Sequence, residues 1–163
     1  MRLFVAVWPP AAVLDAIEAL HRPVDGGGRW TRRDQWHVTL RFLGDADPEE
    51  VAAALATVDA RPAEAVLGPA VGLLGRGVVQ VPVAGLDAVA AAVVAATGHL
   101  GRPPEDRPFR GHLTLARIAG RPPDAVLGQP CAGRFAVDAV HLVSSTLGGD
   151  AARYETLASV RLA

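Results

Sequence analysis

The stretch WHVTLRF, residues 36–42, closely resembles the stretch GHLTLAR, residues 111–117. Each contains a histidine, an apolar residue, a threonine and a leucine in that order, which gives His37 with Thr39 and His112 with Thr114. Valine, leucine, threonine and aromatic residues favour β-strands, so both stretches are predicted to be strands. Alternate side chains of a strand point to opposite faces. Each histidine therefore shares a face with its threonine, and two such pairs facing each other would make a symmetric polar cleft.

The same alternation predicts which face of each strand the neighbouring side chains occupy. In the first stretch it predicts a core face made of Trp36, Val38, Leu40 and Phe42. Arg41 is expected on the opposite face, beside the histidine and the threonine, where a guanidinium can make a charge-assisted contact with an anion. In the second stretch Arg117 falls one position out of step with its histidine. Both arginines are candidate phosphate-binding residues, and Phe109 is a candidate to line the cleft.

An internal repeat accompanies the two stretches. His37 and His112 are 75 residues apart, and the same offset relates an expected strand at 3–8 to one at 78–83 and an expected helix at 13–20 to 88–95. Each half reads strand, helix, loop and histidine strand. We predict a single domain over residues 1–163 that consists of two pseudo-symmetric lobes, with both histidine strands beside one cleft.

The remaining elements follow from local signals. Asp47 before Pro48 predicts a helix start, because Asp is a good N-cap and Pro fits the first helical position. A further helix is expected at 86–99, and strands at 65–74, 135–144 and 154–162. Pro82 cannot donate a backbone hydrogen bond, so the strand at 78–83 is predicted to lie at a sheet edge or to end early.

Composition restricts the function classes. Half of the 163 residues are hydrophobic and the net charge is −1, which predicts a folded core and excludes a strong overall attraction to long nucleic acids. Cys131 is the only cysteine, so no disulfide framework is expected. The apolar N-terminus is interrupted by prolines at 9 and 10, and the run at 88–96 is too short to cross a bilayer. We expect a cytoplasmic protein with no membrane contact.

Two imidazoles that face one substrate suit paired acid–base catalysis, because histidine titrates near neutral pH and one ring can be protonated while the other is neutral. Phosphodiester hydrolysis needs a base for water and an acid for the leaving oxygen. The threonine hydroxyls can donate hydrogen bonds to the phosphoryl oxygens, where charge is held in the transition state. His37, His112, Thr39 and Thr114 are therefore the candidate catalytic set.

Two other kinds of site are less favoured. Two histidines without a carboxylate at ligand spacing are too few for a closed zinc site, so no metal is predicted. A Ser-His-Asp triad lacks a serine in a nucleophile-elbow context, since Ser144, Ser145 and Ser159 lie in the C-terminal hairpin.

The chain resembles the two-histidine phosphoesterases, and within them the RNA 2′,3′-cyclic phosphodiesterases, which are also called 2′-5′ RNA ligases. The similar segments are RLFVA at 2–6, HVTLRFLG at 37–44, RPFRGHLTLAR at 107–117, SSTL at 144–147 and the pair at 154–155. They extend over nearly the whole chain. Residues 61–84 are least similar to the family, and Gly111 stands where the family pattern has proline.

The resemblance implies an α+β, bilobal duplicated fold, with two antiparallel sheets about a central cleft and helices on the outside. It implies metal-independent opening of a 2′,3′-cyclic phosphate to a 2′-phosphate, with no cofactor. His37 and His112 would be the acid–base pair, with Thr39 and Thr114 holding the phosphate. We assign His37 as the acid for the leaving 3′ oxygen and His112 as the base for water. The reverse reaction would give weak 2′-5′ RNA ligase activity.

Two alternatives stay open. A non-catalytic module that binds RNA ends would have lost at least one histidine or threonine, and this chain keeps all four. A phosphodiesterase for other small cyclic phosphates, such as ADP-ribose cyclic phosphate, would use the same residues. The expected partner is an RNA or nucleotide with a 2′,3′-cyclic phosphate end, bound by a monomer.

Overall fold

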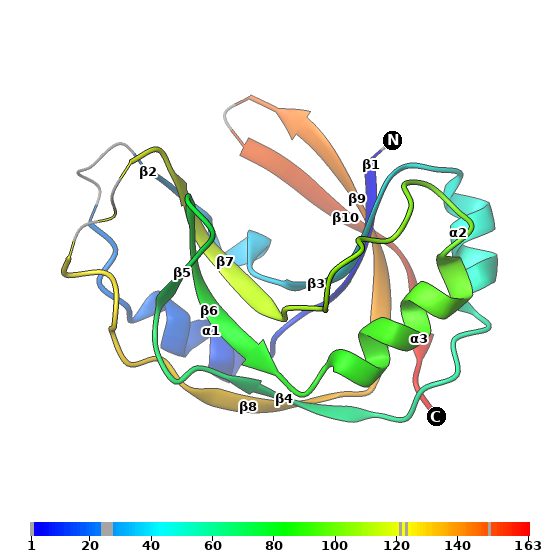
Figure 1. Ribbon diagram of the computed structural model, residues 1–163, viewed down its shortest axis with the longest axis horizontal. Coiled ribbons are helices and arrows are strands. Elements are labelled where there is room, and N and C mark those ends of the chain that lie inside the picture. The colour runs from blue at the N-terminus through cyan, green and yellow to red at the C-terminus, as the bar shows by residue number, and fades with distance from the viewer. Residues whose placement is uncertain (1, 24–27, 121, 123, 150) are drawn as a thin grey trace.

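The structure, a computed structural model, describes residues 2–23, 28–120, 122, 124–149 and 151–163. Within these ranges the chain forms ten strands and three α-helices (Figure 1). The strands are β1 (Arg2–Val7), β2 (Gly28–Trp30), β3 (Val38–Asp45), β4 (Ala63–Leu67), β5 (Gly72–Leu74), β6 (Val78–Ala84), β7 (His112–Ile118), β8 (Gly133–Val137), β9 (Ala139–Gly148) and β10 (Ala151–Arg161). The helices are α1 (Ala11–Glu18), α2 (Pro48–Leu55) and α3 (Asp87–Thr97), with a 3₁₀ turn η1 at Arg33–Gln35.

All strand pairings are antiparallel, and the strands form one continuous curled sheet where we expected two sheets. Its order is β10-β9-β1-β3-β7-β6-β4-β8, with β2 added beside β7 and β5 beside β6. The predicted α+β class is confirmed. β3 and β7 are neighbours at the centre of this order. The 75-residue offset relates β1 to β6 and β3 to β7, so equivalent strands lie on the two sides of the β3–β7 pair.

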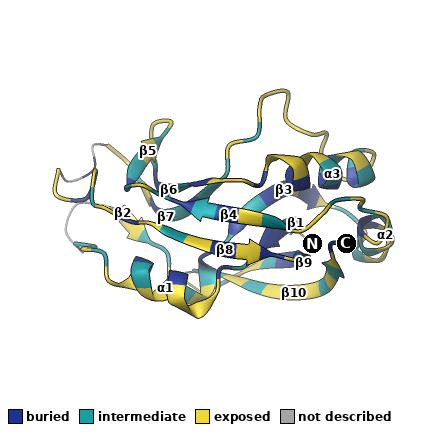
Figure 2. Ribbon diagram, turned by 90° about the horizontal axis from the view of Figure 1, so that it is seen from below, coloured by how far each residue is buried: buried dark blue, intermediate teal, exposed yellow. Residues whose placement is uncertain are grey.

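The main core lies on the face of the sheet that the three helices cover. α2 begins at the predicted place, since the Asp47 carboxylate accepts hydrogen bonds from the backbone N–H groups of Glu49 (2.8 Å) and Glu50 (3.3 Å). Val51 and Leu55 form its buried face. Figure 2 shows the buried residues concentrated in the central strands, with exposed residues along the outer sides of α1 and α2. The opposite face of the sheet at β3 and β7 therefore remains for polar residues.

Two β-bulges occur at equivalent positions in the two halves. In the β1–β3 pair, Val5 pairs with Arg41 and Ala6 with Thr39, so Leu40 is the extra residue. In the β6–β7 pair, Val79 pairs with Ala116 and Gln80 with Thr114, so Leu115 is extra. Positions 40 and 115 are separated by the same 75 residues as the histidines. Because an extra residue changes which side chains face the core, each bulge reverses the alternation beyond its threonine.

The prediction for Pro82 was wrong, since β6 runs through it and lies inside the sheet. The carbonyl of Pro82 accepts a hydrogen bond from Gly68, next to β4. A residue in an antiparallel strand directs its nitrogen and its carbonyl to the same neighbour. β6 pairs with β5 through residue 80 and with β4 from residue 83, so the missing N–H of the proline falls between these two partners. The expected strand at 65–74 is likewise divided, into β4 and β5.

Candidate active site

The two histidine strands meet at one pair of residues, Val38 of β3 and Leu113 of β7. Both are fully buried in the main core. The residues on either side of them must point to the other face. Since the strands are antiparallel, this register directs His37 toward Thr114 and Thr39 toward His112. We call this surface the histidine face: the face of β3 and β7 that bears these four residues, opposite the main core.

Each histidine ring is held by a backbone carbonyl two residues before it. His37 Nδ1 lies 2.6 Å from the Gln35 oxygen, and His112 Nδ1 lies 2.8 Å from the Arg110 oxygen. A carbonyl oxygen only accepts, so Nδ1 carries the hydrogen in both rings. This leaves Nε2 as the nitrogen that can exchange a proton. In His37, Nε2 accepts a hydrogen bond from the Thr39 hydroxyl at 3.0 Å.

Aromatic side chains surround His37. Its ring centroid lies 4.9 Å from Phe4, 5.6 Å from Trp8 and 5.2 Å from Tyr154, which meets it edge-on at 86°. Tyr154 comes from β10, so the β9–β10 hairpin contributes to this end of the site. Burial lowers the pKa of His37 because it disfavours the charged ring, and the nearby charge of His112 lowers the pKa further, against the hydrogen bond to the Gln35 carbonyl. The two imidazoles are thus close enough to influence each other.

The prediction that Arg41 shares this face was wrong. Arg41 is 4% exposed, and its side chain lies at the C-terminal end of α3. Its Nη1 donates to the carbonyl and hydroxyl oxygens of Thr97, and its Nη2 donates to the carbonyls of Leu100 (2.9 Å) and Arg102 (2.7 Å). The guanidinium thus ties the last residue of α3 to the loop that follows it, and its positive charge lies at the negative end of the helix. The bulge at Leu40 causes the change, since it turns the next residue inward.

The equivalent bulge has the opposite effect on Arg117. Ala116 is fully buried and Arg117 is exposed, so the arginine that was one position out of step returns to the face of His112 and Thr114. The charges of Arg117 and Arg2 lower the pKa of the Tyr154 hydroxyl, which burial raises more strongly. Arg117 therefore lies in the electrostatic neighbourhood of the tyrosine that contacts His37.

Phe42 was expected in the core, but the first bulge turns it outward and 37% of it is exposed. The guanidinium carbons of Arg2 and Arg102 lie 5.5 Å and 5.7 Å from its ring centroid. The sequence offered no signal for this exposure, because a leucine at the bulge looks like any strand residue. Phe109 packs against the main core and is only partly exposed. The nearby Gly111 has no side chain because a Cβ there would overlap the Val83 carbonyl oxygen.

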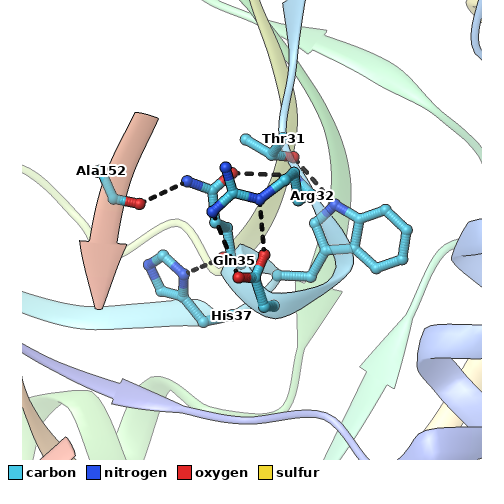
Figure 3. Close-up of polar contacts among 7 residues, drawn as sticks. Thr31, Arg32, Gln35, His37 and Ala152 are labelled. Atoms are coloured by element: carbon cyan, nitrogen blue, oxygen red, sulfur yellow. Dashed lines mark hydrogen bonds and ion pairs between the residues drawn. The ribbon is translucent and has the colours of Figure 1, made fainter. Parts of the chain in front are cut away.

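The turn before β3 connects the two sides of the site (Figure 3). The Thr31 hydroxyl lies 2.9 Å from the carbonyl oxygens of Thr114 and Leu115, which are the bulge residues of β7, and accepts a hydrogen bond from Trp36 Nε1 at 3.0 Å. The Gln35 amide donates to the Ala152 carbonyl of β10 at 2.9 Å. Thus one turn fixes the bulge beside Arg117, the His37 ring and the hairpin that carries Tyr154.

Other candidate groups do not gather at this face. Across the ranges that the structure describes, no three His, Cys, Asp or Glu side chains lie close enough to hold a metal ion. Cys131 is buried, and burial raises the pKa of its thiol. None of the described helices has the length and apolar character that crossing a membrane requires.

Comparisons with known proteins agree with this arrangement. The family model described as LigT like Phosphoesterase matches residues 7–67. The structure of Escherichia coli LigT complexed with 3′-AMP is 27% identical, with a TM-score of 0.81, over 99% of this chain and 97% of that one. LigT of the same organism complexed with NADP⁺ is 26% identical, with a TM-score of 0.77, over 99% and 96%. The structure of TT0787 of Thermus thermophilus is 29% identical, with a TM-score of 0.80, over 99% and 98%. No curated protein matches in sequence.

The curled antiparallel sheet with its paired histidine strands, together with these matches, defines a phosphoesterase of the two-histidine superfamily. Within that class, the chain is similar to the LigT-like phosphoesterases, also known as the 2′-5′ RNA ligase family, in part of its sequence and over the length of its fold.

Proposed function

We propose that the protein hydrolyses 2′,3′-cyclic phosphate ends of RNA or nucleotides to 2′-phosphomonoesters, without a metal ion, by paired-histidine acid–base catalysis. It would act as a monomer in the cytoplasm and have weak ligase activity in the reverse direction. The observation that carries the proposal is the β3–β7 register. It sets two imidazoles and two hydroxyls on one face, with Nε2 free of backbone contacts in both rings among the described residues.

In the proposed reaction, His112 Nε2 takes a proton from water as the water oxygen bonds to phosphorus. The bond from phosphorus to the 3′ oxygen breaks, and His37 Nε2 gives its proton to that oxygen. A 2′-phosphate and a free 3′-hydroxyl result, so atoms and charge balance. The resting pKa of His37 is lowered. A bound phosphate anion favours protonation of a nearby ring, and substrate binding therefore prepares this acid.

Thr39, Thr114 and Arg117 are proposed to hold the phosphoryl oxygens. The hydroxyl of Thr39 already donates to the His37 ring at 3.0 Å, which orients it toward the reacting centre. A guanidinium suits an oxyanion because it offers two parallel N–H donors. The half-exposed ring of Phe42 carries the guanidinium groups of Arg2 and Arg102 over it, and their positive charges suit a nucleotide or RNA chain. E. coli LigT has been crystallised with 3′-AMP and with NADP⁺, which supports a nucleotide ligand for this chain too.

The test is hydrolysis of 2′,3′-cyclic AMP and of a short RNA with a cyclic phosphate end, in EDTA, with separation of 2′- and 3′-phosphate products. The proposal predicts turnover of both substrates to the 2′-phosphate alone. A 3′-phosphate product would overturn the assignment of the leaving oxygen. Tight binding of the RNA end without turnover would instead identify a binding module, and turnover of ADP-ribose cyclic phosphate alone would change the substrate class.

A further inference from the structure

Two arginines lie over one aromatic ring at an end of the sheet. The guanidinium carbons of Arg2 and Arg102 are 5.5 Å and 5.7 Å from the ring centroid of Phe42, within the roughly 6 Å range of a cation–π contact. Arg2 begins β1, Phe42 belongs to β3 and Arg102 to the loop after α3, and Figure 1 shows these segments together. We call the three residues the arginine cluster.

The arginine cluster borders the histidine face. Leu3 of β1 is fully buried in the main core, so its neighbours Arg2 and Phe4 point to the opposite face. Phe4 pairs with Phe42 across the β1–β3 ladder, and its ring centroid lies 4.9 Å from that of His37. The ring of Phe4 therefore links the arginine cluster to the proposed acid.

Backbone contacts fix the position of Arg102 beside β3. Its N–H donates to the Leu43 carbonyl at 2.8 Å, and its own carbonyl accepts from Nη2 of the buried Arg41 at 2.7 Å. The side chain passes over Gly44, where a Cβ would lie 3.4 Å from its Cγ and Cδ atoms. Because both of its backbone groups are bonded, the Arg102 side chain extends from a fixed point toward Phe42.

The arginine cluster brings two positive charges together at the surface. Among the residues that the structure describes, neither guanidinium takes part in an ion pair, whereas those of Arg107 and Arg134 do. Like charges repel, so an anion that contacts both guanidiniums offsets their repulsion and is attracted by each. A phosphate group suits this position, because the planar fork of guanidinium N–H groups matches its oxygens.

We propose that the arginine cluster binds the backbone phosphate one nucleotide before the cyclic phosphate of an RNA end. The inference rests on the proposed function and adds a second anion site next to the one for the reacting phosphate. Phe42 is three residues from Thr39, so their Cα atoms are at most about 10 Å apart along β3. The arginine side chains are long enough to reach a neighbouring phosphate of the same strand. A mononucleotide lacks this phosphate, so the cluster favours RNA ends over 2′,3′-cyclic AMP.

The test compares kcat/KM on two dinucleotides that differ by one charge. The first is ApA with a 2′,3′-cyclic phosphate end, and the second is the same molecule with a neutral methylphosphonate in place of its internal phosphate. The wild type should prefer the charged dinucleotide about tenfold, the scale of two exposed charge contacts. 2′,3′-Cyclic AMP, which has no internal phosphate at all, provides the reference rate.

Four variants locate the origin of this preference. Arg2→Ala and Arg102→Ala should each reduce it about threefold, and the double variant should abolish it. Asp45→Asn removes the negative charge opposite Arg2 in the β1–β3 register and should increase the preference. Arg134→Ala is the matched control, because it makes the same change in net charge on β8, at one end of the strand order, and should leave the preference unchanged.

Product binding separates this inference from the proposed function. ApA with a 2′-phosphate end should bind more tightly than 2′-AMP. Its affinity should also fall more steeply with salt, by about 0.7 in the slope of log K against log salt concentration for the additional phosphate contact. The double arginine variant should lose both differences.

Equal kcat/KM on the two dinucleotides, or a preference that survives in the double variant, overturns the second anion site and leaves the proposed function standing. A wild type that hydrolyses no cyclic phosphate, but binds the dinucleotide product through the two arginines, overturns the proposed function alone.

Discussion

β3 and β7 carry the same motif and the same bulge, but they differ in the residue that the bulge turns inward. In β3 this residue is Arg41, and Phe42 then faces outward; in β7 it is Ala116, and Arg117 faces outward. One arginine thus binds the end of α3, and the other lies exposed on the histidine face, where we propose that it holds the phosphate. The comparison shows that the same β-bulge, present in both strands, can turn one arginine into the interior and leave another on the surface.

The largest expected effect separates the two arginines. Arg117→Ala should lower kcat/KM on 2′,3′-cyclic AMP by on the order of 10²–10³, the scale of one lost oxyanion donor, with little change in stability. Arg41→Ala should lower the free energy of unfolding by about 2–4 kcal/mol, because it removes the hydrogen bonds of a buried guanidinium to Thr97, Leu100 and Arg102 and leaves a cavity at the α3 end. Its kcat/KM, per folded molecule, should change less than about tenfold, the scale of one neutral hydrogen bond.

Steady-state kinetics and urea denaturation on both variants check this contrast. Arg41→Lys is the control, since it keeps the charge at the helix end but only one nitrogen, and should be intermediate in stability. Equal activity losses in the two alanine variants, with Arg41→Ala fully stable, would contradict the two roles.

The next effect concerns the bulge of β7. Thr31→Val keeps the side-chain shape but removes the hydroxyl that contacts the Thr114 and Leu115 carbonyls. We expect about a tenfold loss of kcat/KM, because small misplacement of a positioned group is costly in catalysis. Thr31→Ser should restore most of it.

A double-mutant cycle shows whether the loss acts through Arg117. In an Arg117→Ala background, Thr31→Val should cost little further activity while still lowering the melting temperature. Independent, multiplicative losses would mean that Thr31 does not act through Arg117.

The burial of His37 makes the stability of the fold depend on pH. Its pKa in the folded protein is lowered from the ordinary value of 6.5 by burial. The unfolded chain therefore binds more protons, and stability falls as the pH drops below 6.5 until the lowered pKa is passed. Tyr154→Ser exposes the ring to water, so an NMR titration should show the His37 pKa moving up toward its ordinary value. Tyr154→Phe keeps the ring contact and should leave it in place; a shift of equal size in both variants would contradict burial as the cause.

The smallest expected effects on stability and activity concern the residues two positions before each histidine. Gln35 and Arg110 are 75 residues apart, and the carbonyl of each holds a histidine ring. Only Gln35 also uses its side chain, which donates to Ala152. Gln35→Ala should cost about 1 kcal/mol of stability and a few-fold in kcat/KM, the scale of one hydrogen bond. Arg110→Ala should change neither. Equal effects in the two variants would show that the hairpin contact is unimportant.

The shared face of the two histidines and two threonines was predictable from the sequence. Strand alternation holds around Val38 and Leu113, and both are buried as it requires. The start of α2 was predictable because the Asp47 cap is a local signal. Alternation failed beyond Leu40 and Leu115, since a bulge depends on pairing between strands and leaves no mark in a leucine. The faces of Arg41 and Phe42 were misjudged for this reason, and Arg117, named as a candidate, was expected one position out of step with its histidine.

Longer-range features had no sequence signal either. Tyr154 is 117 residues from His37, and its contact with the ring depends on how the β9–β10 hairpin lies against the rest of the sheet. Pro82 was misjudged because its missing donor matters only where a partner strand is present.

The most direct test of the account is kcat/KM on 2′,3′-cyclic AMP in EDTA for His37→Ala, His112→Ala and the double variant. If the two rings act as one acid–base pair, each single variant should lose at least about 10²–10⁴ in rate, and the double variant should lose little more than either one. All three should remain folded, as judged by circular dichroism and thermal melting. A single variant that keeps activity near the wild-type level would contradict the account.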